Sequence, residues 1–99
     1  MIIIVGQVAL RPESREAAIE RALWMSRLTE AERGYVRYRF AADLADPNTL
    51  VLIAEWESEE VLRDHFMTPP MAEFNRALPG LVASAPIVTR YDVAAGRAI

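Results

Sequence analysis

The sequence contains no cysteine and no lysine, and it has a single histidine, His65, and four glycines. Without cysteine the chain can form neither a disulfide nor a thiolate nucleophile. One histidine excludes a metal site built from several histidines of one chain. The glycines, at positions 6, 34, 80 and 96, are too scattered for a glycine-rich phosphate loop. We therefore expect a colourless, metal-free protein that carries no cofactor.

Long apolar runs and basic stretches are also missing. All 11 cationic side chains are arginine, and with 14 acidic residues the formal net charge is −3. Because no basic stripe appears, nucleic acid and membranes are not expected partners. No apolar run approaches the length of a membrane span, and the start of the chain lacks the basic residues of a signal peptide. The sequence therefore predicts a cytoplasmic protein.

What the chain has in excess is apolar surface. Its 99 residues predict one domain, residues 1–99, with a thin core. The 53% of hydrophobic residues is above the usual share. We therefore expect part of this surface to lie in an interface between subunits.

The most informative stretch predicts a strand followed by two short helices. Leu50–Trp56 is a near-continuous apolar run, typical of a strand buried on both faces. Ser58 suits a helix N-cap, and the two glutamates after it suit the first turn of the helix. Thr68-Pro69-Pro70 ends this helix and can cap the next one. One face of the first helix then carries Val61, Leu62, His65 and Phe66.

Three further strands and one further helix follow from the same periodicities, which also give the bounds of the second short helix. The strands are predicted at Ile2–Leu10, Tyr35–Phe40 and Ala85–Val93, and Asp46-Pro47-Asn48 predicts a turn within a hairpin. The helices are predicted over about Ser14–Glu32, ended by Gly34, and over Pro70–Leu78. The inner side of the long helix is predicted at Ile19, Ala22, Leu23 and Ser26, beside Ala18, Met25 and Thr29, and its far side at Trp24 and Leu28.

The order of these elements, β-α-β-β-α(α)-β, is the split βαβ pattern of a ferredoxin-like α+β fold. The helices suffice for only one face of the four-stranded antiparallel sheet. The other face is apolar on the first and third strands. On the first strand, Gln7 is a polar residue in a row of buried character. A second copy of the sheet is the simplest cover, so we expect a dimeric α+β barrel.

Several segments resemble the antibiotic biosynthesis monooxygenase (ABM) domain, and within that family the small quinol monooxygenases. They are Glu32–Tyr38, Asp46-Pro47, Glu55–Glu59, His65, and Pro69–Met71 with Phe74. The most specific is Glu-Trp-Glu-Ser with a histidine nine residues after Trp56. The resemblance spans most of the chain and implies a homodimeric barrel with a cavity between sheet and helices in each subunit. It also implies oxygenation of quinols or polyphenols by dioxygen without metal, flavin or haem.

Two branches of the family differ from this chain at residues that matter. The anthrone-type oxygenases share Trp56, but they have asparagine and tyrosine where this chain has Leu52 and Leu62. The haem-degrading members use an asparagine, a tryptophan and a histidine where this chain has Gln7, His65 and Asn75. The haem-ligating histidine is therefore missing, and neither reaction is expected.

Cofactor-free oxygenation needs a base, groups that hold an anion, and a dry cavity. His65 is the candidate catalytic base, because histidine titrates near neutral pH. Tyr38 and Gln7 are candidates for orienting a phenolic oxygen, and Trp56 and Phe66 for stacking on an aromatic ring. Four of these five residues also have a structural interpretation. His65 would bond a backbone carbonyl, Trp56 would fill the core, Tyr38 would pack on the sheet, and Gln7 would bond neighbouring backbone.

These residues lead to two hypotheses about function. The first is a monooxygenase that acts on a small aromatic substrate, a quinol or polyphenol, with dioxygen. The second is a protein of the same fold without redox chemistry, either a small-molecule-binding dimer or an isomerase of a small oxo compound. Oxygen uptake with a panel of hydroquinones distinguishes them.

Overall fold

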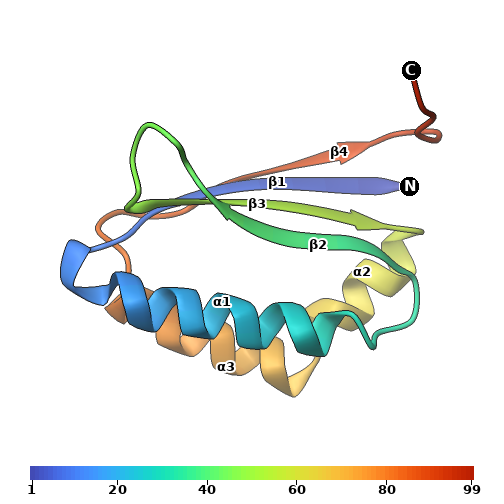
Figure 1. Cartoon of the computed structure of the whole chain (residues 1–99). Helices are drawn as coiled ribbons and strands as arrows, with labels where there is room; N and C mark the ends of the chain where they lie inside the picture. The colour runs from blue at the N-terminus through green and yellow to red at the C-terminus, as the bar shows by residue number, and fades with distance from the viewer.

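The computed structural model describes all 99 residues and consists of one antiparallel sheet with helices on one side (Figure 1). The sheet has the order β2-β3-β1-β4, so β1 and β3 are central. This order confirms the predicted ferredoxin-like α+β fold. The strands are β1 (Ile2–Ala9), β2 (Tyr35–Ala42), β3 (Thr49–Trp56) and β4 (Ile87–Asp92). The helices are α1 (Arg15–Thr29), α2 (Glu59–Phe66) and α3 (Pro69–Ala77), with the 3₁₀ turns η1 (Pro12–Ser14) and η2 (Leu78–Gly80).

The sheet has one face against the helices and one open face. Successive side chains of a strand point to opposite faces. On β1, Ile2 and Ile4 are therefore buried under the helices, whereas Val5 is 39% exposed on the open face. The main core joins the helix-side residues of β1, β2 and β3 to α1 and α2. It consists of Ile2, Ile4, Met25, Tyr38, Ala54, Trp56, Val61 and Leu62.

The burial expected for Gln7 is not present within one chain, and it depends on the second sheet of the expected dimer. Gln7 is exposed, and it pairs with Val51 on one side and Ile87 on the other. Its neighbours in β1 face the helices, so its side chain points to the open face. The sequence pattern is apolar on both faces, but within one chain only one face has a cover.

The long helix α1 is rotated relative to its prediction. Its buried residues are Ala18, Ala22, Met25 and Thr29, whereas Leu23, predicted on the inner side, is 53% exposed. Trp24 was predicted on the far side, but it packs against the main core, and the Arg21 guanidinium lies 5.2 Å from its ring centroid. Small residues on the inner side let the helix lie close to the sheet, and this closeness decides the rotation.

The connection from α1 to β2 is locked onto α2. Gly34 has a φ of +79°, a conformation that favours glycine. A Cβ at this position would lie 2.5 Å from both γ-methyl carbons of Val61 in α2, so a side chain has no room there. The backbone N–H of Glu57 also donates to the Gly34 carbonyl at 3.0 Å. The connection is therefore held at a fixed position over α2.

The predicted caps of the short helices are present. The Ser58 hydroxyl accepts from the backbone N–H of Val61 at 3.4 Å, and that of Thr68 accepts from Met71 at 3.3 Å. Both satisfy donors that a helix start leaves unpaired. None of the helices combines the length and apolar character that a membrane-spanning segment needs.

Candidate functional site

A cavity of about 410 Å³ lies between the sheet and the helices α2 and α3. Of its 19 lining residues, 14 are hydrophobic, and they come from all four strands and both helices. A volume in this range, with few polar groups, is typical of small-molecule sites. Four lining residues on the helix side are exposed and therefore mark the mouth, which lies between the helices α2 and α3 and the strand β4: Phe66, Asn75, Pro86 and Val88.

Three of the predicted site residues meet at one end of this cavity. The ring centroids of Trp56 and His65 are 4.6 Å apart, and those of Tyr38 and His65 are 5.6 Å apart. Tyr38 is the β2 partner of Ala54, two residues before Trp56, so both aromatic side chains point from adjacent strands to the same helix. His65 is only 2% exposed, on the buried face of α2 with Val61 and Leu62.

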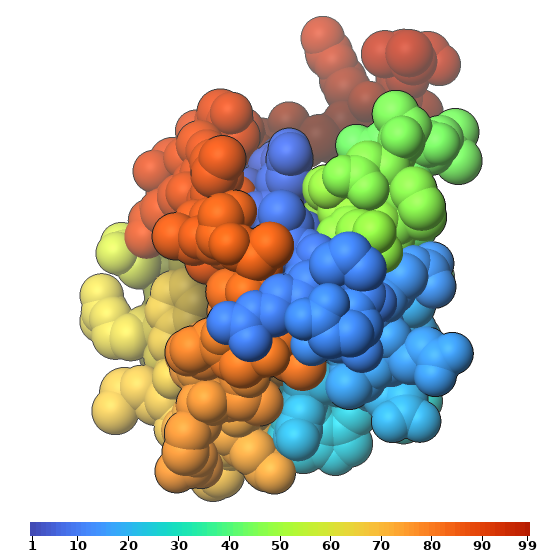
Figure 2. All heavy atoms as spheres, turned by 90° about the vertical axis from the view of Figure 1, so that its left-hand side faces the viewer, coloured from blue at the N-terminus to red at the C-terminus, as the bar shows by residue number.

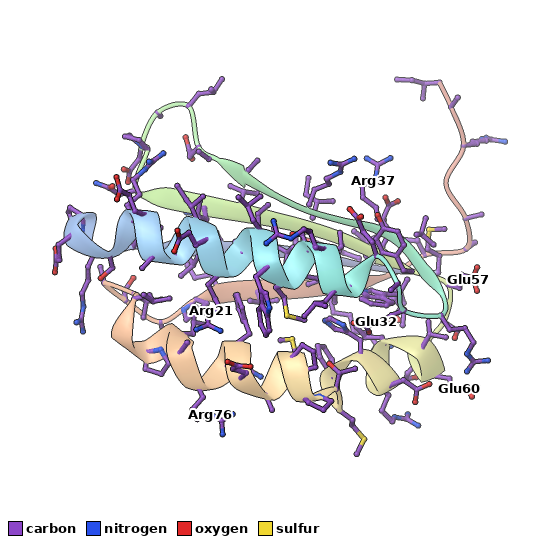
Figure 3. The ribbon with its side chains drawn as sticks, turned by 60° about the horizontal axis from the view of Figure 1, so that its bottom comes forward. Arg21, Glu32, Arg37, Glu57, Glu60 and Arg76 are labelled. Atoms are coloured by element: carbon purple, nitrogen blue, oxygen red, sulfur yellow. The ribbon has the colours of Figure 1, made fainter.

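His65 has a side-chain partner that the sequence interpretation missed. Its Nδ1 lies 2.9 Å from Oε1 of Glu32. Glu32, labelled in Figure 3, belongs to the connection that Gly34 holds over α2. Val61, under Gly34, is one helical turn before His65, so the same packing places Glu32 beside the imidazole. The interpretation that His65 bonds a backbone carbonyl was therefore wrong. Glu32 begins the segment Glu32–Tyr38, which resembles the ABM domain. The number of residues between Glu32 and His65, however, does not indicate that the two are in contact.

The carboxylate determines which imidazole nitrogen is free. An ionised carboxylate only accepts, so Nδ1 of a neutral His65 carries the proton and donates it to Glu32. Nε2 then has a lone pair and makes no hydrogen bond within the chain. No side-chain nitrogen or oxygen is sealed from solvent without a partner, so Nε2 must reach open space. Because His65 is buried and lines the cavity, that space is the cavity.

Tyr38, like His65, is buried and turns a polar atom without a partner toward the cavity. It is 3% exposed, it lines the cavity, and its hydroxyl has no partner within the chain. Burial, with a smaller contribution from the negative charge of Glu32, raises the pKa of Tyr38 well above its usual range. The phenol therefore stays protonated and can donate a hydrogen bond to an anion in the cavity. The site thus places a base and a donor in apolar surroundings.

The other two predicted site residues lie at the edges of the cavity. The Phe66 ring lies 5.8 Å from that of His65, and Phe66 is 54% exposed at the mouth. Gln7 borders the cavity through its place between Gly6 and Val8, with its side chain toward the open face. Nowhere do three His, Asp or Glu side chains gather as they do around a metal ion.

A family model places this chain among known proteins. The model for the antibiotic biosynthesis monooxygenases matches residues 1–77. The chain belongs to this family. The match includes every strand except β4, and it includes Glu32, Tyr38, Trp56 and His65.

Two relatives in sequence are distant. An uncharacterised Synechocystis protein, sll1783, is 26% identical over 93 residues, which are 94% of this ABM chain and 63% of that protein. The chain thus spans less than two thirds of this relative's length. YcnE of Bacillus subtilis, provisionally named a monooxygenase, is 26% identical over 65 residues, 66% of this chain and 68% of YcnE.

Solved structures of similar shape agree on the fold. A Deinococcus radiodurans protein, provisionally assigned as an antibiotic biosynthesis monooxygenase, has a TM-score of 0.93 at 20% identity, with 100% of this chain and 98% of that chain covered. Rv0793 of Mycobacterium tuberculosis has a TM-score of 0.91 at 21% identity, with 98% of both chains covered. At such identities the likeness shows the ferredoxin-like fold of the family alone.

Proposed function

We propose that this ABM protein is a cofactor-independent monooxygenase that oxidises a quinol or polyphenolic aromatic with dioxygen. One observation carries the proposal. His65, held by Glu32 at Nδ1, presents its free Nε2 to an apolar cavity of the size of a small aromatic molecule. A base in such surroundings can remove the proton of a phenolic hydroxyl, and the resulting electron-rich anion can react with dioxygen directly.

The proposed reaction starts when Nε2 takes a proton from the substrate hydroxyl. Glu32 stabilises the imidazolium that forms, because it carries the opposite charge 2.9 Å from Nδ1. The quinolate then gives one electron to dioxygen, and the two radicals combine at a ring carbon that carries hydrogen. The peroxide anion that forms takes the proton back from the His65 imidazolium and becomes a hydroperoxide. The hydroperoxide loses water and leaves a carbonyl at that carbon. One quinol and one dioxygen thus yield one hydroxyquinone and one water.

The aromatic residues have distinct roles in this proposal. Tyr38 donates to the substrate oxygen as its charge develops, which stabilises the anion in a dry site. Trp56 forms the closed wall behind His65, and Phe66 covers the aromatic ring of the substrate from the side of the mouth. Gln7 has no part in the chemistry, because its side chain points to the open face.

We further propose that the protein is a homodimer in which the open faces of two sheets meet. Val5, Ile53, Ile87 and Tyr91 expose 39%, 43%, 69% and 51% of their surface on this face. An apolar patch over several strands is unusual on a monomer and typical of an interface. The second sheet would cover it and complete an α+β barrel, with Gln7 in the interface.

The Glu32–His65 pair also supports a second candidate, an isomerase that moves a proton within a small oxo compound. Both reactions need the same base, but only the first consumes dioxygen. The test is oxygen uptake with a panel of hydroquinones, with mass analysis of products formed under ¹⁸O₂. The oxygenase gives a product with one labelled oxygen more and two hydrogens fewer. Conversion without uptake or change in mass would establish the isomerase instead.

A further inference from the structure

The cavity is longer than a single aromatic ring, and strand pairing divides its floor into rows. On β3 the rows are formed by every second residue, and each has a partner in β1. At about 3.3 Å per residue the first and last rows are roughly 20 Å apart. They are Trp56–Ile2, Ala54–Ile4, Leu52–Gly6 and Leu50–Val8.

The two ends of this floor differ in chemistry. Trp56 and Tyr38, which pairs with Ala54, lie in the first two rows together with the His65 ring. The last row has Leu50 and Val8, and the facing turn η2 adds Leu78. Besides His65, the helices contribute one polar side chain to the cavity lining, Asn75, which is exposed at the mouth. The cavity is therefore polar at one end and apolar at the other.

The apolar end is closed by backbone. Leu10, just after β1, forms an isolated bridge with Val82, and the Arg11 N–H donates to the Leu81 carbonyl at 3.0 Å. The Ala83 N–H donates to the Ala9 carbonyl at 2.8 Å. Figure 2 shows this end, where the segment after α3 (orange) lies against the β1–α1 connection (blue). A ligand that enters through the mouth therefore meets a wall there.

Gly6 keeps the passage between the ends open. It lies in the third row, between Leu52 and Val88. A Cβ at Gly6 would lie 3.5 Å from the Leu52 Cβ and 3.6 Å from a Val88 methyl carbon, which are ordinary contacts. Its φ is not positive, so the backbone does not require glycine. The missing side chain instead leaves space at the middle of the cavity floor.

We infer that the cavity binds a phenol or quinol that carries an aliphatic substituent. The hydroxyl lies at His65 and Tyr38, and the hydrocarbon chain passes over Gly6 to the Leu50–Val8 end. At about 30 Å³ per group, the 410 Å³ hold roughly fourteen non-hydrogen groups. A phenol ring with its hydroxyl takes about seven of these groups and a quinol about eight, so about six or seven remain for carbons of the chain. The inference rests on the proposed function for the placement of the hydroxyl.

The test measures binding without turnover. Titration of the protein with 4-alkylphenols, from methyl to decyl, gives the dissociation constant by calorimetry. The affinity is expected to rise about three- to fourfold per added methylene, and to stop rising at about six or seven carbons, where the chain meets the closed end. Gly6→Val places a side chain across the path and should remove most of this rise. Gly80→Ala is the matched control, because nothing lies within 4 Å of its added Cβ.

Each outcome bears on the inference. A wild-type affinity independent of chain length overturns it, and so does an unchanged rise in Gly6→Val. An affinity that keeps rising beyond the stated length shows that the chain leaves through the mouth, which also overturns it. If Gly6→Val does not fold, Gly6→Ala should shorten the rise by about one carbon. A chain-length effect without oxygen uptake would keep the inference and overturn the oxygenase, whereas uptake without the effect would do the reverse.

Discussion

The two faces of the sheet are similar in sequence and opposite in structure. On β3 the helix-side residues Ala54 and Trp56 are each 1% exposed, whereas Ile53 between them is 43% exposed. On the helix side, neighbouring rows enclose a cavity with an imidazole and a phenol at one end and only apolar side chains at the other. The open side has exposed apolar residues and, beside them, an ion pair in which Arg37 Nε lies 2.8 Å from Glu55 Oε2.

This difference shows how one apolar strand can serve two purposes. The helices do not fill the space above the sheet completely, because Gly6 in β1 leaves volume beneath α2 and α3, whereas no residue of α1 lines the cavity. The open face has no such layer, and its flat apolar surface suits a second sheet. Chemistry is thus expected on one side and assembly on the other, and substitutions can separate the two.

The largest effect is expected from His65→Ala on the covered face. Removal of the base should lower oxygen uptake with a hydroquinone by about two to four orders of magnitude. Thermal unfolding of the same preparation shows whether the fold survives. If turnover per folded molecule stays the same while the melting temperature falls, His65 is structural and the difference between the faces is one of packing only.

Glu32→Gln tests how the base is held. The amide keeps the shape of the side chain but lacks the charge, so turnover should fall about ten- to a hundredfold, the loss typical when a carboxylate that orients a metal-bound imidazole is replaced. His65 is the only histidine, so its ¹⁵N resonances are unambiguous. They should show a proton at Nδ1 in the wild type and a mixture of tautomers in the variant. The same tautomer in both proteins would remove Glu32 from the mechanism.

Ile53→Arg tests the open face. The new charge lies opposite Arg39 in the strand pairing, so two sheets should no longer meet there. Light scattering should give about twice the 11.1 kDa chain mass for the wild type and 11.1 kDa for the variant. Leu44→Arg is the control, because Leu44 is fully exposed in the β2–β3 loop. A wild-type monomer would contradict the barrel and leave the face unexplained.

The smallest expected effect is on the pH dependence of stability, and it is tested by comparing Tyr38 on the covered face with Tyr91 on the open face. Tyr38 is buried, and its pKa is raised above the ordinary value of 10. Below that value folded and unfolded chains both keep the proton, so Tyr38 adds no pH dependence. Above it the unfolded chain releases the proton and the folded chain retains it, so stability falls as pH rises.

The slope from this one residue is about 0.7 kcal/mol per pH unit at pH 10, where half of the unfolded tyrosine is ionised, and it approaches about 1.4 kcal/mol per pH unit at higher pH. Tyr38→Phe should remove it, as measured by urea unfolding between about pH 10 and 11. Tyr91→Phe, on the open face, should keep it, because Tyr91 is half exposed. Equal slopes in both variants would mean that the covered face does not hold Tyr38 in its neutral form.

The elements were predictable because they depend on local patterns. Ser58 and Thr68 cap their helices as expected, and Asp46-Pro47-Asn48 makes its turn, where the Asp46 carboxylate accepts from the Asn48 N–H at 3.0 Å. The rotation of α1 and the exposure of Gln7 could not be predicted in this way, because both depend on which other parts of the protein pack against the segment. The alternation of side chains along a strand shows that the sheet has two faces, but it does not show which face the helices cover.

The candidate site divides in the same way. The sequence by itself determined that one histidine shares a helix face with apolar residues, near a strand that ends in Trp56, because helical and strand periods are properties of the chain. Only the tertiary structure decided that Glu32 meets His65, 33 residues away. That contact depends on Gly34 packing against Val61, and a distance between two segments is set by the atoms packed between them.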